Sequence, residues 1–252
     1  MARRSALVLV RGVADRLRLD EAVPLLSLGL VGFLGWGFLA LADEVSEGES
    51  LRLDRALLLA FRSAADPSMP LGPGWVQEAA RDVTGLGGTF VLVFITLSAV
   101  AYLWLTDRRH AALLVLVSIG GGTLLGVLLK QGFDRARPDV VPHAMRVYTA
   151  SFPSAHAMMS ATTYLTLGAL LARVHASLRE KLFFLGIAVI LTLLIGISRI
   201  YLGVHWPSDV LAGWCLGAAW AVLCWYVALV LQRRGQVEPE RAPGEERPPP
   251  AA

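Results

Sequence analysis

The class of fold follows from the stretch at residues 111–129, AALLVLVSIGGGTLLGVLL, in which no charged residue interrupts the apolar side chains. A helix of about 20 apolar residues spans the hydrocarbon layer of a membrane. Inside that layer no water is available to the backbone, so a spanning segment must pair its amides and carbonyls internally, as a helix does. The stretch therefore predicts a transmembrane helix.

Similar runs occur along the whole chain. Together they predict six membrane spans, at residues 23–42, 86–105, 111–129, 155–172, 182–197 and 210–231. Only 17% of the 252 residues are charged and 55% are hydrophobic, whereas soluble domains carry about 25% charged residues. The sequence predicts an all-α, polytopic membrane protein whose surface faces the lipid bilayer.

The spans divide the chain into three parts. We expect a cytoplasmic N-terminal segment at 1–22, a six-helix membrane domain at 23–231 and a cytoplasmic tail at 232–252. The tail is rich in Pro, Glu and Arg, a composition typical of disorder. Between the first two spans, residues 51–65 and 75–83 have an amphipathic pattern, which predicts helices that lie on the membrane surface.

Glycines within the spans predict close helix packing, because small residues let transmembrane helices approach each other. These positions are Gly120, Gly121, Gly122, Gly126, Gly186, Gly213 and Gly217.

Basic residues indicate the orientation. They cluster in the N-terminal segment, at 106–110, at 173–181 and at 233–234, and with six spans all four clusters lie on one side of the membrane. Because arginine-rich loops stay in the cytoplasm, both termini are expected there, in the cytoplasmic (inner) membrane of the cell. The net charge of +3 is explained by these orienting clusters. The sequence contains no platform of aromatic and basic residues, so we expect no nucleic-acid partner.

The two connections on the opposite side are unusually polar. They contain KQGFDRARP at 130–138, SFPSAH at 151–156 and SRIYLGVHWPSD at 198–209. Ionisable groups beside a membrane interior are costly, and they usually mark a functional site.

Three of these groups are cations suited to a phosphate. Lys130, Arg137 and Arg199 would stabilise a phosphate dianion and its more highly charged transition state. Ser154 directly precedes the fourth span, where its hydroxyl and the first free backbone amides of a helix can bind an anion.

Two histidines supply the remaining chemistry. His205 and Asp209 are four positions apart, so the carboxylate can hold one imidazole nitrogen and leave the other as an oriented nucleophile. His156 comes from another helix and can protonate a leaving oxygen.

Each residue alone has a simpler structural interpretation. Lys130 could be an interfacial anchor, Ser154 and Asp209 could cap helices, and for Arg135 the choice between an anchor and a ligand stays open. A zinc site at His156, His205 and Asp209 is disfavoured because three neighbouring cations would repel a metal. We therefore expect neither a metal nor another cofactor.

The combined pattern resembles the three-part signature of the type 2 phosphatidic acid phosphatase (PAP2) superfamily. The resemblance covers about residues 85–231 and rests on Lys130 with Arg137-Pro138, on Pro153-Ser154-Ala155-His156, and on Ser198-Arg199 with His205 and Asp209. The superfamily includes bacterial lipid phosphatases, undecaprenyl-diphosphate phosphatases, glucose-6-phosphatase and vanadium haloperoxidases.

The resemblance implies a role for each matching residue. His205 would carry a phosphohistidine, Asp209 would orient it, and His156 would act first as general acid and then as base. The phosphoryl oxygens would be held by Lys130, Arg137, Ser154, Ala155 and Arg199. Most members have Gly at the position of Ala155, but the backbone amide that binds phosphate is retained.

The expected function is hydrolysis of a phosphomonoester or diphosphate of a membrane lipid, on the extracytoplasmic face. Undecaprenyl diphosphate, phosphatidylglycerol phosphate and phosphatidate all fit. A lipid-linked phosphotransferase using the same histidine is the main alternative; a haloperoxidase, or a transporter or scaffold with a vestigial site, is weaker. The sequence leaves the oligomeric state open.

Overall fold

The computed structural model describes residues 2–141 and 150–234, with side chains described from residue 22 onward. These residues form eight helices: α1 (Ala2–Glu47), α2 (Leu51–Leu59), α3 (Gly74–Gly85), α4 (Thr89–Leu105), α5 (Arg109–Gly132), α6 (Ala155–Val174), α7 (Leu178–Tyr201) and α8 (Pro207–Arg233). The all-α prediction is confirmed. The predicted tail lies outside the described residues from position 235 onward, and α1 runs without a break through the predicted boundary at residue 22.

Every predicted span coincides with a helix, but the count of six is not established. Among the described residues, four helices are long and apolar enough to cross a membrane: the part of α1 from Ala22 to Glu47, and α5, α7 and α8. The pair α3 and α4, bent by 44° at its break, makes a fifth candidate if it is one span. The bend explains why α4 begins at Thr89 and not at the predicted residue 86. Helix α6 is less apolar because it buries several hydroxyl side chains.

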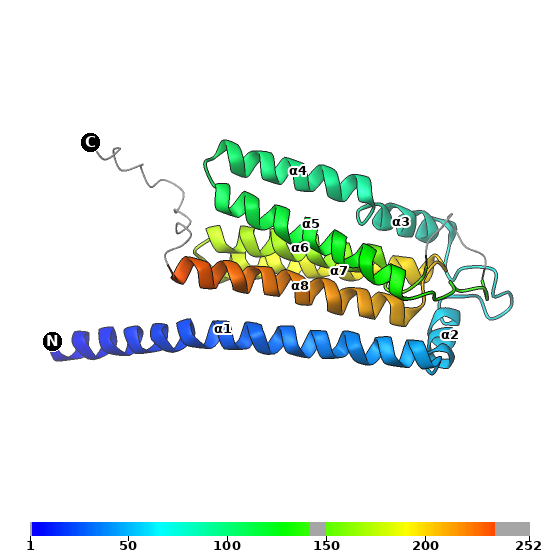
Figure 1. Cartoon of the computed structure of the whole chain (residues 1–252), viewed down its shortest axis with the longest axis horizontal. Coiled ribbons are helices and arrows are strands. Elements are labelled where there is room, and N and C mark those ends of the chain that lie inside the picture. Colours follow the sequence, from blue (N-terminus) through cyan, green and yellow to red (C-terminus); the bar gives the residue numbers. More distant parts are fainter. Residues whose placement is uncertain (1, 142–149, 235–252) are drawn as a thin grey trace.

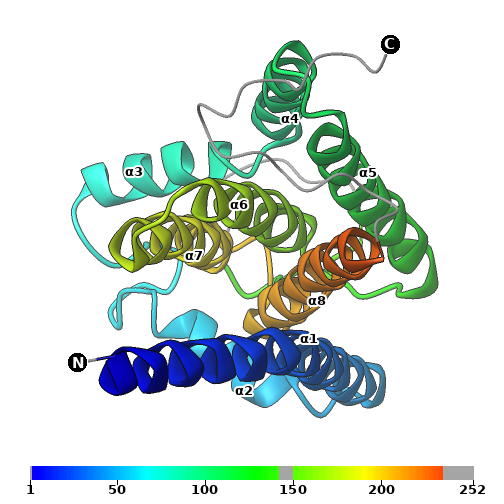
Figure 2. The same cartoon turned by 90° about the vertical axis from the view of Figure 1, so that its left-hand side faces the viewer.

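The long helices lie side by side along the molecule (Figure 1). Helix α6 packs on both α7 and α8, α1 packs on α8, and α4 packs on α5; an end-on view shows α8 between α1 and α6 (Figure 2). The connections α4–α5 and α6–α7 lie at one end of the bundle, and α5–α6 and α7–α8 lie at the other, together with α2 (Figure 1).

Two glycines of α8 allow its close approach to α6. A methyl group built on Gly213 would lie 2.7 Å from the carbonyl oxygen of Ser154, and one on Gly217 would lie 2.2 Å from that of Met158. The prediction of close packing is confirmed at these positions. It is wrong at Gly120 and Gly186, where a methyl group would meet nothing within 4 Å.

Large apolar side chains cover much of the outside of the bundle. Phe90 is 83% exposed, Leu105 84% and Leu25 71%. A soluble monomer rarely exposes contiguous apolar surface of this extent, so these side chains fit a bundle that faces lipid.

The segment between α1 and α4 forms the two predicted amphipathic helices, α2 and α3, but α2 is shorter than the predicted 51–65. The helix ends at Leu59, and the chain turns back so that Arg62 pairs with Pro70. Helix α2 turns Asp54 and Leu58 inward and leaves Leu53 and Leu57 exposed. One face of α2 is therefore part of the protein interior.

Candidate active site

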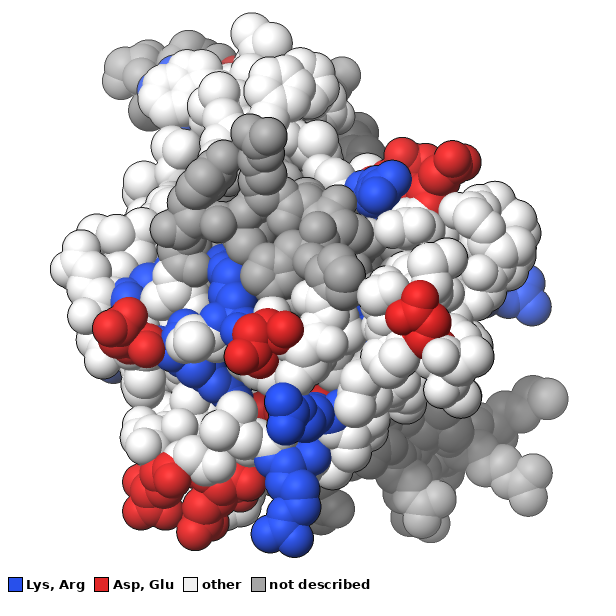
Figure 3. Space-filling model, turned by 90° about the vertical axis from the view of Figure 1, so that its right-hand side faces the viewer, with Lys and Arg blue, Asp and Glu red and all other residues white. Residues whose placement is uncertain are grey.

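The signature residues gather at the end of the bundle that carries α2. They come from the last turn of α5, the α5–α6 connection, the first turn of α6, the end of α7, the α7–α8 connection and the first turn of α8. Viewed from this end, Lys and Arg side chains lie in a group beside Asp and Glu side chains (Figure 3).

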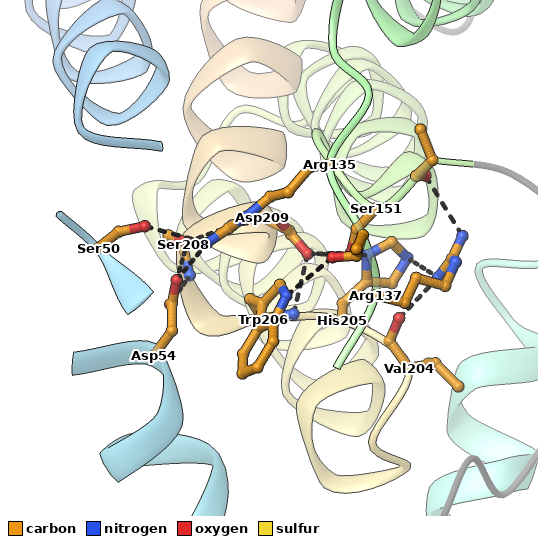
Figure 4. A network of polar contacts seen from close by, with 12 residues as sticks. Ser50, Asp54, Arg135, Arg137, Ser151, Val204, His205, Trp206, Ser208 and Asp209 are labelled. Atoms are coloured by element: carbon orange, nitrogen blue, oxygen red, sulfur yellow. Dashed lines mark hydrogen bonds and ion pairs between the residues drawn. The ribbon is translucent and has the colours of Figure 1, made fainter. Parts of the chain in front are cut away.

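His205 and Asp209 form the predicted pair. The Nδ1 atom of His205 lies 3.3 Å from Oδ2 of Asp209, and both side chains are buried. The same oxygen accepts a hydrogen bond from the backbone amide of Trp206 at 2.9 Å and from the hydroxyl of Ser151 at 2.5 Å (Figure 4). Asp209 thus caps α8 and holds the histidine at the same time.

The second imidazole nitrogen faces Arg137. Nη1 of Arg137 lies 3.1 Å from Nε2 of His205 and donates to the carbonyl oxygen of Val204 at 2.6 Å. Because a guanidinium can only donate, Nε2 is the unprotonated nitrogen and the hydrogen resides on Nδ1, directed at Asp209. The lone pair of Nε2 therefore points to the cation expected to bind phosphate.

His205 is neutral at physiological pH. Burial lowers the pKa of His205 to about 4, although the hydrogen bond from its ring to Asp209 and the charge of that carboxylate act in the opposite direction. A neutral, oriented imidazole is the form required of a nucleophile.

The other cations lie in the same region. Nζ of Lys130 donates to the carbonyl oxygen of Ala150 at 3.0 Å, and Nη1 of the buried Arg199 donates to Oγ1 of Thr84 at 3.1 Å. Burial, and after it the charge of Arg199, lowers the pKa of His156, which is half-buried in the first turn of α6. A bound phosphate dianion would offset the neighbouring positive charges and allow His156 to hold the proton that a general acid donates.

Ser154 is placed to receive an anion. It is the residue that precedes α6, and its backbone amide donates to the carbonyl oxygen of Asp209 at 3.0 Å. Its hydroxyl is buried and has no hydrogen-bond partner among the described residues, which costs free energy unless a ligand supplies one. The first amides of α6, beginning with Ala155, are the free donors of a helix N-terminus.

Residues whose role the sequence interpretation left open or did not assign complete the site. Arg135 joins Asp209 at 2.5 Å to Asp54 of α2 at 2.7 Å, and its side chain is only 10% exposed. It is therefore an internal ion-pair partner and not an interfacial anchor. Ser151, Ser208 and Thr84 were also unassigned; each lies next to a signature residue in space.

The sequence contains a weak indication that Asp54 is buried. It lies four positions before Leu58, so the two side chains share the face of α2 that the structure buries. A carboxylate on a buried helix face requires a cationic or hydrogen-bonding partner, but the sequence does not indicate which one.

The described part of the chain contains no cluster of three or more His, Cys, Asp and Glu side chains that could hold a metal ion. His205 contacts Asp209 and Arg137, and Asp209 also contacts Arg135, Ser151 and the amide of Trp206.

Comparisons with known proteins identify relatives. The sequence profile of the PAP2 superfamily matches residues 111–233. Phosphatidylglycerophosphatase B of Bacillus subtilis is 34% identical over 145 residues, which are 57% of this chain and 70% of that protein. Lipid A 1-phosphatase of Rhizobium johnstonii is 30% identical over 187 residues, which are 65% of this chain and 71% of that protein.

The fold has a counterpart among solved structures. A crystal structure of a transmembrane PAP2-type phosphatidylglycerolphosphate phosphatase from Bacillus subtilis superimposes with a TM-score of 0.65 and 25% identity, over 85% of this chain and 98% of that one. The sequence relationship and the fold thus point to the same group of membrane proteins.

Proposed function

Because the chain belongs to the PAP2 superfamily of multi-pass membrane phosphatases, we propose that it hydrolyses a lipid phosphomonoester or diphosphate with His205 as the nucleophile. The observation that carries this proposal is the imidazole of His205, whose Nδ1 faces Asp209 and whose Nε2 faces Arg137. A phosphoryl group held by Arg137 would lie directly beside the attacking nitrogen.

The first chemical step transfers the phosphoryl group to the protein. Nε2 of His205 attacks phosphorus, the bond from phosphorus to the leaving oxygen breaks, and His156 donates a proton to that oxygen. Asp209 stabilises the positive charge that develops on the imidazole. Lys130, Arg137, Arg199, the hydroxyl of Ser154 and the amide of Ala155 hold the phosphoryl oxygens, whose charge grows in the transition state.

The second step releases phosphate. His156, now neutral, takes a proton from a water molecule, whose oxygen attacks phosphorus while the bond to Nε2 breaks. Both histidines return to their starting state. All the groups that this cycle uses are side chains and backbone amides of the chain itself.

One comparison and one prediction bear on the lipid. The phosphatidylglycerophosphatase that is 34% identical supports phosphatidylglycerol phosphate. The predicted extracytoplasmic position of the site supports a diphosphate carrier lipid such as undecaprenyl diphosphate, with phosphatidate as the third member of the class.

The test is phosphate release by the detergent-purified full chain from a panel of these lipids, with His205→Gln as control. We expect release from at least one lipid, and loss of release in the variant. Transfer of phosphate to an added lipid or sugar acceptor, without free phosphate, would instead identify a phosphotransferase. Release by neither route would contradict the proposal.

A further inference from the structure

The short helix α2, which belongs to the segment between α1 and α4, reaches the catalytic carboxylate through one arginine. We propose that Asp54 of α2 is a positioning residue, which acts through Arg135 to hold Asp209 in the orientation that His205 requires. This inference rests on the proposed function, because it concerns the same histidine. It assigns a role in the reaction to a helix outside the residues matched by the family profile, which begin at position 111.

Both oxygens of Asp54 are engaged with residues beside the site. Oδ1 accepts a hydrogen bond from the backbone amide of Ser208 at 2.8 Å. Oδ2 accepts from the hydroxyl of Ser208 at 2.6 Å and from Nη2 of Arg135 at 2.7 Å (Figure 4). Asp54 is only 2% exposed, so water does not compete for these contacts.

Arg135 connects Asp54 to Asp209. Nη2 binds Asp54, together with the hydroxyl of Ser50 at 3.0 Å, and Nη1 binds Oδ1 of Asp209 at 2.5 Å. The guanidinium is planar and rigid, so fixing one terminal nitrogen fixes the other. Its plane also lies near the ring of Trp206, with 5.8 Å between Cζ and the ring centroid.

The two terminal nitrogens of Arg135 bind different carboxylates, and this determines which oxygen of Asp209 is bound. An arginine beside a single carboxylate tends to bind both oxygens in a bidentate pair. Asp54 prevents this because it retains one nitrogen of Arg135, and only Oδ1 of Asp209 is bound by the other. Oδ2 then stays with His205, Ser151 and the amide of Trp206.

Removing the charge of Asp54 should therefore release Arg135 toward Asp209 and draw Oδ2 away from His205. The imidazole would lose its orientation and much of the stabilisation of its positive charge in the transition state. Substrate binding would change little, because Asp54 contacts none of the residues proposed to hold the phosphoryl oxygens. The effect should fall on kcat and leave KM nearly constant.

The alternative is that Asp54 merely docks α2 on the start of α8, through its bonds to Ser208. A double-mutant cycle separates the two roles, since residues that act through one another show non-additive effects. Asp54→Asn is combined with Asp209→Asn, and both are compared with Asp66→Asn. Asp66 is exposed on the same segment, and its Oδ1 accepts a hydrogen bond from the amide of Ser68.

The experiment measures kcat and KM of the full chain in detergent, on the lipid that the wild type hydrolyses fastest. Asp54→Asn should lower kcat by roughly 10- to 100-fold, as expected when a reacting group loses its alignment, with KM within about two-fold and Asp66→Asn unchanged. In the Asp209→Asn background, adding Asp54→Asn should cost less than about two-fold more. An equal loss in both backgrounds, or a wild-type kcat in folded Asp54→Asn, would overturn the proposal.

Two further variants keep the outcome decisive. If Asp54→Asn does not fold, Arg135→Lys takes its place, because a lysine keeps the charge but cannot bridge two carboxylates with a fixed fork. The same loss of kcat is expected, and a wild-type kcat there would overturn the proposal. His205→Gln, measured in parallel, isolates the proposed function: if that variant retains activity, the histidine mechanism fails whatever Asp54 does.

Discussion

At the scale of single residues, the two nitrogens of His205 have opposite surroundings. Asp209 accepts a hydrogen bond from Nδ1, and Arg137 donates one to Nε2. These two contacts select one tautomer and one orientation of the ring. The same carboxylate also caps the first turn of α8. The nucleophile is thereby fixed to the start of a long helix.

The first prediction concerns this pair. Replacing His205 by Gln should leave the chain folded and lower turnover by several orders of magnitude, because the covalent route is lost. Asp209→Asn should also be severe, since the imidazole loses its orientation. Phosphate release by the detergent-purified variants is the measurement, and the elution profile on size exclusion is the control for folding. Substantial turnover by folded His205→Gln would contradict the mechanism.

The pH dependence follows from the environment of His205. Burial lowers its pKa from 6.5 to about 4, so the nucleophile stays neutral down to about pH 4. The rate should rise through that region as the ring loses its proton, because only the neutral imidazole can attack phosphorus. The measurement is kcat/KM against pH, corrected for ionisation of the substrate phosphate. An acid limb near 6.5 would indicate a solvent-exposed nucleophile.

Cations supplied by side chains lead to a third prediction. Because Lys130, Arg137 and Arg199 are proposed to neutralise the phosphoryl charge, EDTA should leave the rate nearly unchanged. Vanadate resembles pentacoordinate phosphorus, so it should inhibit. Phosphate release is measured with each reagent alone, and with EDTA followed by Mg²⁺ or Zn²⁺. A strict requirement for added metal ions would count against the proposed mechanism.

At the scale of elements, the sequence predicted every long helix because each contains an apolar run that needs internally paired backbone in lipid. The ends of the helices were predicted less well. The bend before α4 and the early end of α2 at Leu59 depend on contacts between elements. The Arg135–Asp54 pair joins positions 81 residues apart, and a single sequence contains no signal for the partner of either residue.

The contact between α6 and α8 gives the prediction at this scale. A methyl group at Gly217 would lie 2.2 Å from the carbonyl oxygen of Met158, so Gly217→Ala should force the helices apart and destabilise the fold by about 1–3 kcal/mol. Gly186→Ala, whose added methyl meets nothing within 4 Å, is the matched control and should not lower stability. Thermal unfolding in detergent measures both variants. Equal stability of both would contradict the close packing.

At the scale of the whole molecule, the bundle has two chemically different ends. The α4–α5 and α6–α7 connections, with the basic clusters at 106–110 and 173–181, lie at one end, and the proposed active site lies at the other (Figure 1). The sequence predicted this separation because alternate connections of a helical bundle fall on the same side. If the basic end is cytoplasmic, the site meets lipids of the outer leaflet.

The last prediction tests this orientation by cysteine labelling in intact cells, after Cys215 and Cys224 have been replaced. Asp139 is exposed near the site and Ala176 is exposed in the α6–α7 connection, so a cysteine at either position is accessible to a reagent on its own side. Asp139→Cys should react with a membrane-impermeant maleimide in intact cells, and Ala176→Cys only after permeabilisation. The reverse pattern would place the site in the cytosol. Phosphate lipids of the inner leaflet would then be the substrates, and the support that orientation gives to a diphosphate carrier lipid would be lost.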